Sequence, residues 1–147
     1  MQYVARVIRE GGAIVAIMII VGFGCGSGSS TPQALRDGRS VYGDRCSTCH
    51  GNRGQGGVGP KLSGVRETWP DCDDHQEWIA LGSEAWKVEH GPTYGANDAP
   101  IDDAMPAHAE SLTALEIASV AAFERVEYGG GDAATELAAC GIPDTTE

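Results

Sequence analysis

Residues 46–50 read CSTCH, and the glycine-rich stretch GNRGQGGVGPKLSG follows at once over residues 51–64. On a helix, positions i, i+3 and i+4 lie on one face, so Cys46, Cys49 and His50 are expected to project to the same side. This arrangement suits thioether bonds from the two cysteines to the vinyl groups of a haem, with the His50 imidazole as proximal ligand of the iron. The motif therefore predicts covalent attachment of one haem c.

Two other chemistries use closely spaced cysteines. A thioredoxin-like redox pair is found between a strand and a helix, and a zinc site requires a second pair of ligands at compatible spacing. The sequence shows no strand pattern before Cys46. It therefore favours haem attachment over a redox pair or half of a zinc site.

The N-terminus has the layout of an export signal, because Arg6 and Arg9 precede an apolar run over residues 13–24. This run of 12 residues is shorter than the roughly 20 needed to cross a bilayer as a helix. Cys25 ends the run, and the segment resembles the signals of bacterial lipoproteins, which makes Cys25 a candidate for lipidation. The alternative is cleavage nearby and a free domain; in both cases we expect the domain to leave the cytoplasm.

We therefore expect three segments: an export signal over residues 1–25, a flexible linker over 26–33, and one domain over 34–147. The chain has five cysteines. Once Cys25 and the two of the CSTCH motif are assigned, Cys72 and Cys140 remain. In an oxidising compartment they most simply form a disulfide.

Charge is distributed unevenly along the chain. Residues 26–66 carry six basic and two acidic residues, whereas residues 67–147 carry two basic and 18 acidic ones. The overall acidity argues against nucleic acid and against an anionic lipid surface as partners. Arg45, Arg53 and Lys61 are close in sequence to the haem-attachment motif, which predicts a positive patch there facing an acidic partner.

Helix patterns dominate, and strand patterns are nearly absent. We expect a first helix with Thr31 as N-cap that ends before Gly51, and then a glycine-rich loop to residue 66. The expected second helix begins at Asp73 and breaks at Gly82. The remaining expected elements are a loop over 93–111, a helix with a Thr113–Glu116 capping box, and a short helix capped by Asp132 that runs up to Cys140.

Three segments resemble class I cytochromes c: ALRDGRSVYGDRCSTCHG (34–51), GVGPKLSG (57–64) and LTALEIASVAAFERVEYG (112–129). The resemblance implies an all-α cytochrome c fold, with three to five helices around one covalent haem. It implies that the Pro60 carbonyl binds the far nitrogen of His50. It also implies that Gly38 meets Phe123 where the first and last helices cross.

The resemblance further implies a methionine as sixth ligand of the iron, in a loop before the last helix. Met105, in DDAMPAH (102–108), is the methionine outside the export signal. The rival ligands His75, His90 and His108 are expected to be surface or partly buried histidines. We expect the following side chains to pack around the haem: Leu62, Trp69, Trp78, Trp86 and Tyr94.

Ligation by His50 and Met105 leaves no open coordination position, so we expect a one-electron carrier and not an enzyme. The implied partners are redox proteins of a respiratory chain, with the membrane reached through the lipid anchor. One alternative is a fixed cytochrome c subunit of a membrane respiratory or dehydrogenase complex. Another is a haem enzyme or gas sensor in which Met105 leaves the iron.

Overall fold

The computed structural model describes residues 31–143, which excludes the predicted export signal and Cys25. The described part of the chain is mostly helical, which confirms the all-α class. Its strands are two residues long and pair antiparallel, with Thr93 opposite Pro100. The elements are α1 (Gln33–Val41), the π-helix η1 (Tyr42–Cys46), α2 (Ser47–His50), α3 (Val65–Thr68), α4 (Cys72–Glu89), β1 (Thr93–Tyr94), β2 (Ala99–Pro100), α5 (Ala114–Glu127) and α6 (Ala133–Ala139).

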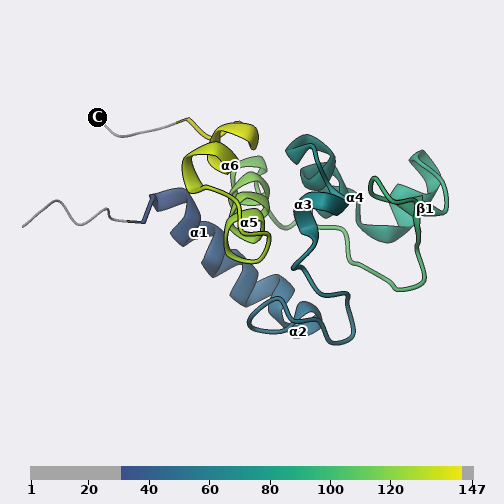
Figure 1. Ribbon diagram of the computed structural model, residues 1–147. Helices are drawn as coiled ribbons and strands as arrows, with labels where there is room; N and C mark the ends of the chain where they lie inside the picture. The colour runs from purple at the N-terminus through teal and green to yellow at the C-terminus, as the bar shows by residue number, and fades with distance from the viewer. Residues whose placement is uncertain (1–30, 144–147) are drawn as a thin grey trace, which may run out of the picture.

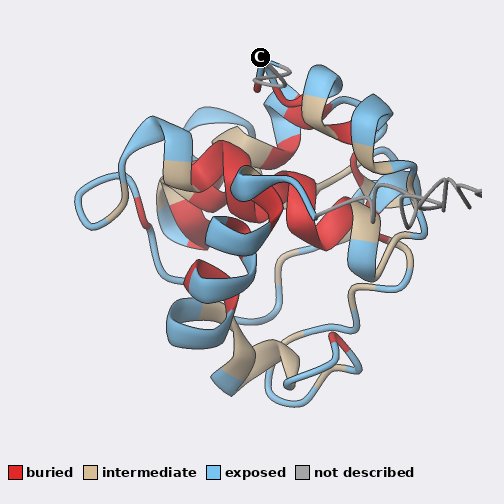
Figure 2. Ribbon diagram, turned by 90° about the vertical axis from the view of Figure 1, so that its left-hand side faces the viewer, coloured by how far each residue is buried: buried red, intermediate tan, exposed pale blue. Residues whose placement is uncertain are grey.

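Helices α1 and α5 pack against each other at the centre of the fold (Figure 1). The contact is close at Gly38, where a Cβ atom would lie 2.1 Å from the carbonyl oxygen of Ser119 and 2.8 Å from Cβ of Phe123. Glycine therefore permits the crossing, and Gly38 meets Phe123 as expected. The buried residues, red in Figure 2, include a continuous stretch of α5 from Ile117 to Arg125. Such a stretch has no exposed face, because neighbouring elements cover α5 on all sides.

The helix starts agree with the sequence at two places and differ at two. Thr113 and Glu116 form the predicted capping box, and Asp132 accepts a hydrogen bond from the Thr135 N–H. Thr31 was wrongly expected to cap α1, since Pro32 occupies the N-cap position and no side chain bonds there. Helix α4 begins at Cys72, one residue earlier than expected, because Asp71 accepts from the Asp73 N–H at 2.9 Å and so caps it.

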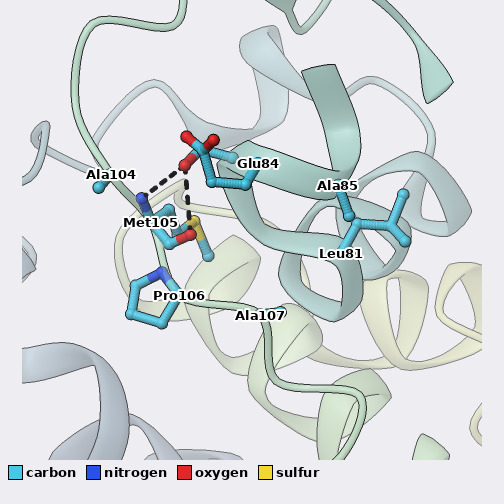
Figure 3. Close-up of a pocket in the computed structure, with 8 residues that line it drawn as sticks. Leu81, Glu84, Ala85, Ala104, Met105, Pro106 and Ala107 are labelled. Carbon is cyan, nitrogen blue, oxygen red and sulfur yellow. Dashed lines mark hydrogen bonds between the residues drawn. The ribbon is translucent and has the colours of Figure 1, made fainter. Parts of the chain in front are cut away.

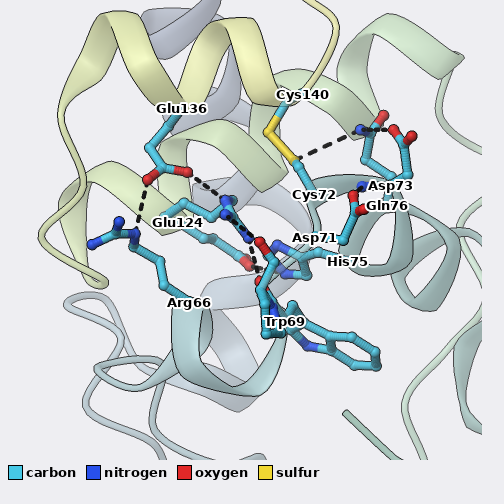
Figure 4. The surroundings of a disulfide bond; sticks show 12 residues. Arg66, Trp69, Asp71, Cys72, Asp73, His75, Gln76, Glu124, Glu136 and Cys140 are labelled. Carbon is cyan, nitrogen blue, oxygen red and sulfur yellow. Dashed lines mark hydrogen bonds and ion pairs between the residues drawn. A yellow bond between two sulfur atoms is a disulfide. The ribbon is translucent and has the colours of Figure 1, made fainter. Parts of the chain in front are cut away.

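Three features tie the C-terminal part of the domain to its middle (Figure 4). A disulfide joins Cys72 at the start of α4 to Cys140 after α6, with 5.2 Å between their Cα atoms. The buried Glu136 carboxylate accepts from Arg125 Nε at 2.6 Å and from Arg66 Nε at 2.8 Å. Arg125 also donates to the backbone carbonyl of Trp69. The segment between α3 and α4 is therefore held against α5 and α6.

Within residues 31–143, no helix has both the length and the apolar character needed to cross a membrane.

Candidate haem site

A cavity of about 580 Å³ is lined by residues of the attachment motif (46–50) and of the loop before α5. Its lining includes Cys46, Cys49 and His50 of the attachment motif, and also Met105. This volume is within the range of small-molecule and cofactor sites. Folding therefore brings together the predicted attachment residues and the predicted sixth ligand.

The attachment residues are held by the end of the first helical stretch. Cys46 is the last residue of η1, while Cys49 and His50 belong to α2. Both thiols are free and half-buried. The buried Tyr42 donates its hydroxyl hydrogen to the Gly51 carbonyl at 2.5 Å, which fixes the turn that ends α2.

The His50 ring is oriented by the loop that follows it. Its Nδ1 lies 2.8 Å from the carbonyl oxygen of Pro60. A carbonyl only accepts hydrogen bonds, so Nδ1 carries the proton and Nε2 keeps a lone pair for a metal. Gly59 packs on the ring, since a Cβ atom there would lie 3.0 Å from Cε1 of His50. The loop itself is anchored by the Gly56 N–H, which donates to the His50 carbonyl at 2.8 Å.

Met105 lies between β2 and α5 and is half-buried. Its main chain contacts Ser83 in α4, because the Met105 N–H donates to Ser83 Oγ at 3.1 Å and its carbonyl accepts from the Ser83 N–H at 2.9 Å. The sequence showed the helix break at Gly82. It carried no sign that the next residue binds the loop of Met105.

Aromatic side chains form the apolar wall of the cavity. Trp78 and Tyr94 stack with ring centroids 4.8 Å apart, and Trp69 packs against both. These three residues and Leu62 line the cavity as expected. Trp86 was expected there too, but it lies outside the lining, in the same cluster, and donates its Nε1–H to the Thr93 carbonyl at 2.9 Å.

The expected placement of the rival histidines was wrong for two of them. His75 and His108 are both buried and line the cavity. His90 is exposed, stacks on Trp86 and lies 3.2 Å from Glu77. Burial, together with the charge of Arg45, lowers the pKa of His108 below its ordinary value, so this imidazole is neutral at neutral pH.

Glu124 of α5 was not predicted from the sequence as a site residue. It is 5 % exposed and lines the cavity. Its carboxylate lies 3.2 Å from Nε2 of His75, whose other ring nitrogen, Nδ1, is buried without a hydrogen-bond partner in the described part of the chain. Burial and the nearby Glu124 charge raise the pKa of the Cys46 thiol to about 12.

Charged residues also line the cavity. Arg45 and Lys61 belong to the attachment side, whereas Asp102 and Asp103 belong to the loop of Met105. All four are exposed. A partner that docks over the cavity therefore meets both positive and negative side chains.

These donors fit a haem c. Two free thiols, an imidazole with a free Nε2 lone pair and a methionine line one cavity that has an aromatic wall. This is the donor set for covalent attachment and for His/Met ligation of iron. The fold and the cavity define the class as a c-type cytochrome domain, which binds haem c covalently and transfers electrons.

Within that class, the chain belongs to the family described as Cytochrome C oxidase, cbb3-type, subunit III, whose sequence model matches residues 33–123. The match covers α1 to most of α5. Helix α6 and Cys140 lie beyond it. No curated protein matches the chain.

Proposed function

We propose that this protein is a one-electron carrier of an extracytoplasmic electron-transfer chain. Cys46 and Cys49 attach the haem, and His50 and Met105 ligate its iron. One observation carries the proposal: the four side chains line a single cavity. When bound, the haem supplies an iron that takes up and releases one electron. The protein supplies the fixed imidazole, the thioether and an apolar wall that excludes water.

The covalent bond and the ligands are tested by spectra. A pyridine haemochrome spectrum and a mass gain of one haem support attachment, and haem that is extracted by acidic organic solvent argues against it.

Met105→Ala is expected to give a high-spin or rearranged haem with a lower reduction potential. His90→Ala is the matched control, because His90 lies outside the cavity lining. An unchanged Met105→Ala spectrum would transfer the role to His75 or His108.

The membrane attachment is part of the proposal and concerns residues outside the described range. Residues 1–25 would direct export, Cys25 would carry the lipid, and residues 26–33 would link it to the domain at 34–147. Cys25→Ser is expected to release the protein from washed membranes into the soluble fraction. Release of the wild-type protein by the same wash, with a mature N-terminus other than Cys25, would favour ordinary cleavage.

The partner is proposed to be an acidic surface on a redox protein. Support comes from Arg45 and Lys61, which are exposed at the attachment side of the cavity. Electron transfer to the partner should slow as salt rises, because charge steering is screened beyond about 8 Å at physiological ionic strength. Lys61→Glu should slow it further without a comparable change in potential. Arg39→Glu makes the same charge change outside the cavity lining and is the control.

A second candidate is a fixed subunit of a respiratory oxidase, which the family description favours. A subunit is expected to co-purify with its complex from mild detergent, and its electron-transfer rate should not respond to salt or to Lys61→Glu. A carrier is expected to purify alone and to respond to both. Fast binding of carbon monoxide by the ferrous protein would instead favour a gas sensor.

A further inference from the structure

Helix α4 contains a kink that contacts the loop of Met105 directly. The kink is at Gly82, whose φ of 64° lies in the left-handed region that favours glycine. A Cβ atom at this position would lie 2.5 Å from the backbone nitrogen of Ala107 and 2.6 Å from the carbonyl oxygen of Met105. Glycine therefore serves two purposes, because it permits the kink and leaves room for the loop.

A break in a helix frees backbone groups from their helical partners, and these groups need new ones. The Ala80 carbonyl accepts from the N–H groups of His108 and Ala109, both at 3.1 Å. The Ser83 N–H donates to the Met105 carbonyl at 2.9 Å. The backbone groups around the kink therefore bind the loop on both sides of Pro106.

The side chain of Ser83 adds to this contact. Its oxygen accepts from the Met105 N–H at 3.1 Å, and its hydroxyl hydrogen is directed to the Met105 carbonyl, with 3.4 Å between the oxygens. Ser83 is fully buried. A single buried residue thus binds both backbone polar groups of Met105.

The rest of the loop has little other support. Asp103, Ala104, Pro106 and Ala107 are exposed. A second cavity of about 370 Å³, lined by residues of α4 and by residues 104–107, adjoins Met105 (Figure 3). Side-chain packing is therefore incomplete on this side of the loop, and the hydrogen bonds to α4 hold its backbone together with the packing of the Met105 side chain against the two hydrophobic clusters.

From this arrangement we infer that the Gly82–Ser83 kink is a positioning element that holds Met105 on the haem iron, and that Ser83 is its side-chain component. The inference rests on the proposed function, in which Met105 is the sixth ligand. A methionine held by its backbone would stay beside the iron of a bound haem when its thioether is not coordinated. The kink therefore keeps the sixth position closed to external ligands and suits the domain to electron transfer rather than gas sensing.

The experiment compares Ser83→Ala with wild type, Ser119→Ala and Met105→Ala in the haem-loaded protein. Ser119 is a buried serine of α5 that lines neither cavity, so Ser119→Ala controls for loss of a buried hydroxyl. The measurements are the rate of carbon monoxide binding to the ferrous form, the methionine-to-iron charge-transfer band of the ferric form, and the reduction potential. Far-ultraviolet circular dichroism checks that each variant is folded.

Loss of one ordinary hydrogen bond and one long one should raise the fraction with dissociated Met105 about tenfold. We expect Ser83→Ala to bind carbon monoxide about tenfold faster, with a weaker band and a lower potential, and Ser119→Ala to behave as wild type. Wild-type behaviour of Ser83→Ala, with the band lost in Met105→Ala, would overturn the positioning role and leave Met105 as ligand. A band that persists in Met105→Ala would overturn the ligand itself.

A second measurement needs no variant and covers the case in which Ser83→Ala does not fold. In the ferrous wild-type protein, amide hydrogen exchange of Met105 should be at least tenfold slower than that of Asp103 and Ala104, because Ser83 accepts its N–H. Equal exchange rates along residues 103–105 would show that Ser83 does not hold this backbone. The positioning role would then be rejected.

Discussion

Substitution of Gly38 by alanine should weaken the packing of α1 on α5. The added Cβ would lie 2.1 Å from the Ser119 carbonyl oxygen and 2.6 Å from its carbonyl carbon. Both atoms belong to the backbone of α5, so a side-chain rotation cannot relieve the overlap and the helices must separate. Overpacking of this kind costs about 1–3 kcal/mol, and we expect a value near 3 kcal/mol because backbone must move.

Alanine also has a higher helix propensity than glycine, which offsets this cost by about 1 kcal/mol. The net loss in free energy of unfolding is therefore about 2 kcal/mol. For a domain of this size the melting temperature should fall by roughly 8 °C. The control is Gly43→Ala, because the space around Gly43 in η1 is free of other atoms within 4 Å.

The assay is thermal unfolding of the ferric, haem-loaded proteins, with equal haem content verified by absorbance because bound haem itself stabilises the fold. We expect Gly43→Ala to melt up to about 4 °C above wild type, because alanine gains about 1 kcal/mol of helix propensity there without any overlap. Equal melting temperatures for the two variants would refute the close crossing of α1 and α5 at Gly38.

Three further predictions concern the bonds and charges around the cavity. The double variant Cys72→Ser/Cys140→Ser should lose about 4 kcal/mol of unfolding free energy in a denaturant titration, and an unchanged midpoint would contradict a stabilising disulfide. Glu136→Gln should cost about 3 kcal/mol, because it leaves the buried Arg125 without its counter-charge, whereas loss of an exposed pair costs far less. His108 has a lowered pKa, so the unfolded chain binds its proton more readily and stability should fall as pH drops below about 6.5. His108→Gln should reduce that fall in melting curves at about pH 7 and pH 5, and an undiminished fall would assign the acid sensitivity to other groups.

The site could be predicted in part because some of its determinants are local in sequence. The CSTCH motif, the Thr113–Glu116 capping box and the break at Gly82 each depend on residues within one or two helical turns. The predicted N-cap of α1 was wrong by one residue, also for a local reason. Thr31 and Pro32 both suit a helix start, and the neighbouring residues alone do not decide between them.

The buried polar contacts could not be predicted in the same way. His75 follows two aspartates and Glu124 precedes an arginine, and charged neighbours of this kind usually indicate an exposed segment. In the structure, His75 of α4 and Glu124 of α5 are nevertheless both buried and form a pair. Ser83 resembles any serine within a helix until the loop of Met105 is placed beside it. Each contact joins elements that are distant in the chain. The sequence pattern of one element therefore cannot predict which residue of another element it will contact.

By itself, the sequence determined the covalent chemistry and the helical class, because thiol spacing, helix capping and helix breaking depend on near neighbours along the chain. The tertiary structure alone decided which backbone holds Met105, which imidazoles are buried, and which charged side chains line the cavity. These properties depend on the distance between α4, α5 and the loop before α5. That distance is set by side-chain packing between the helices, which no local pattern specifies.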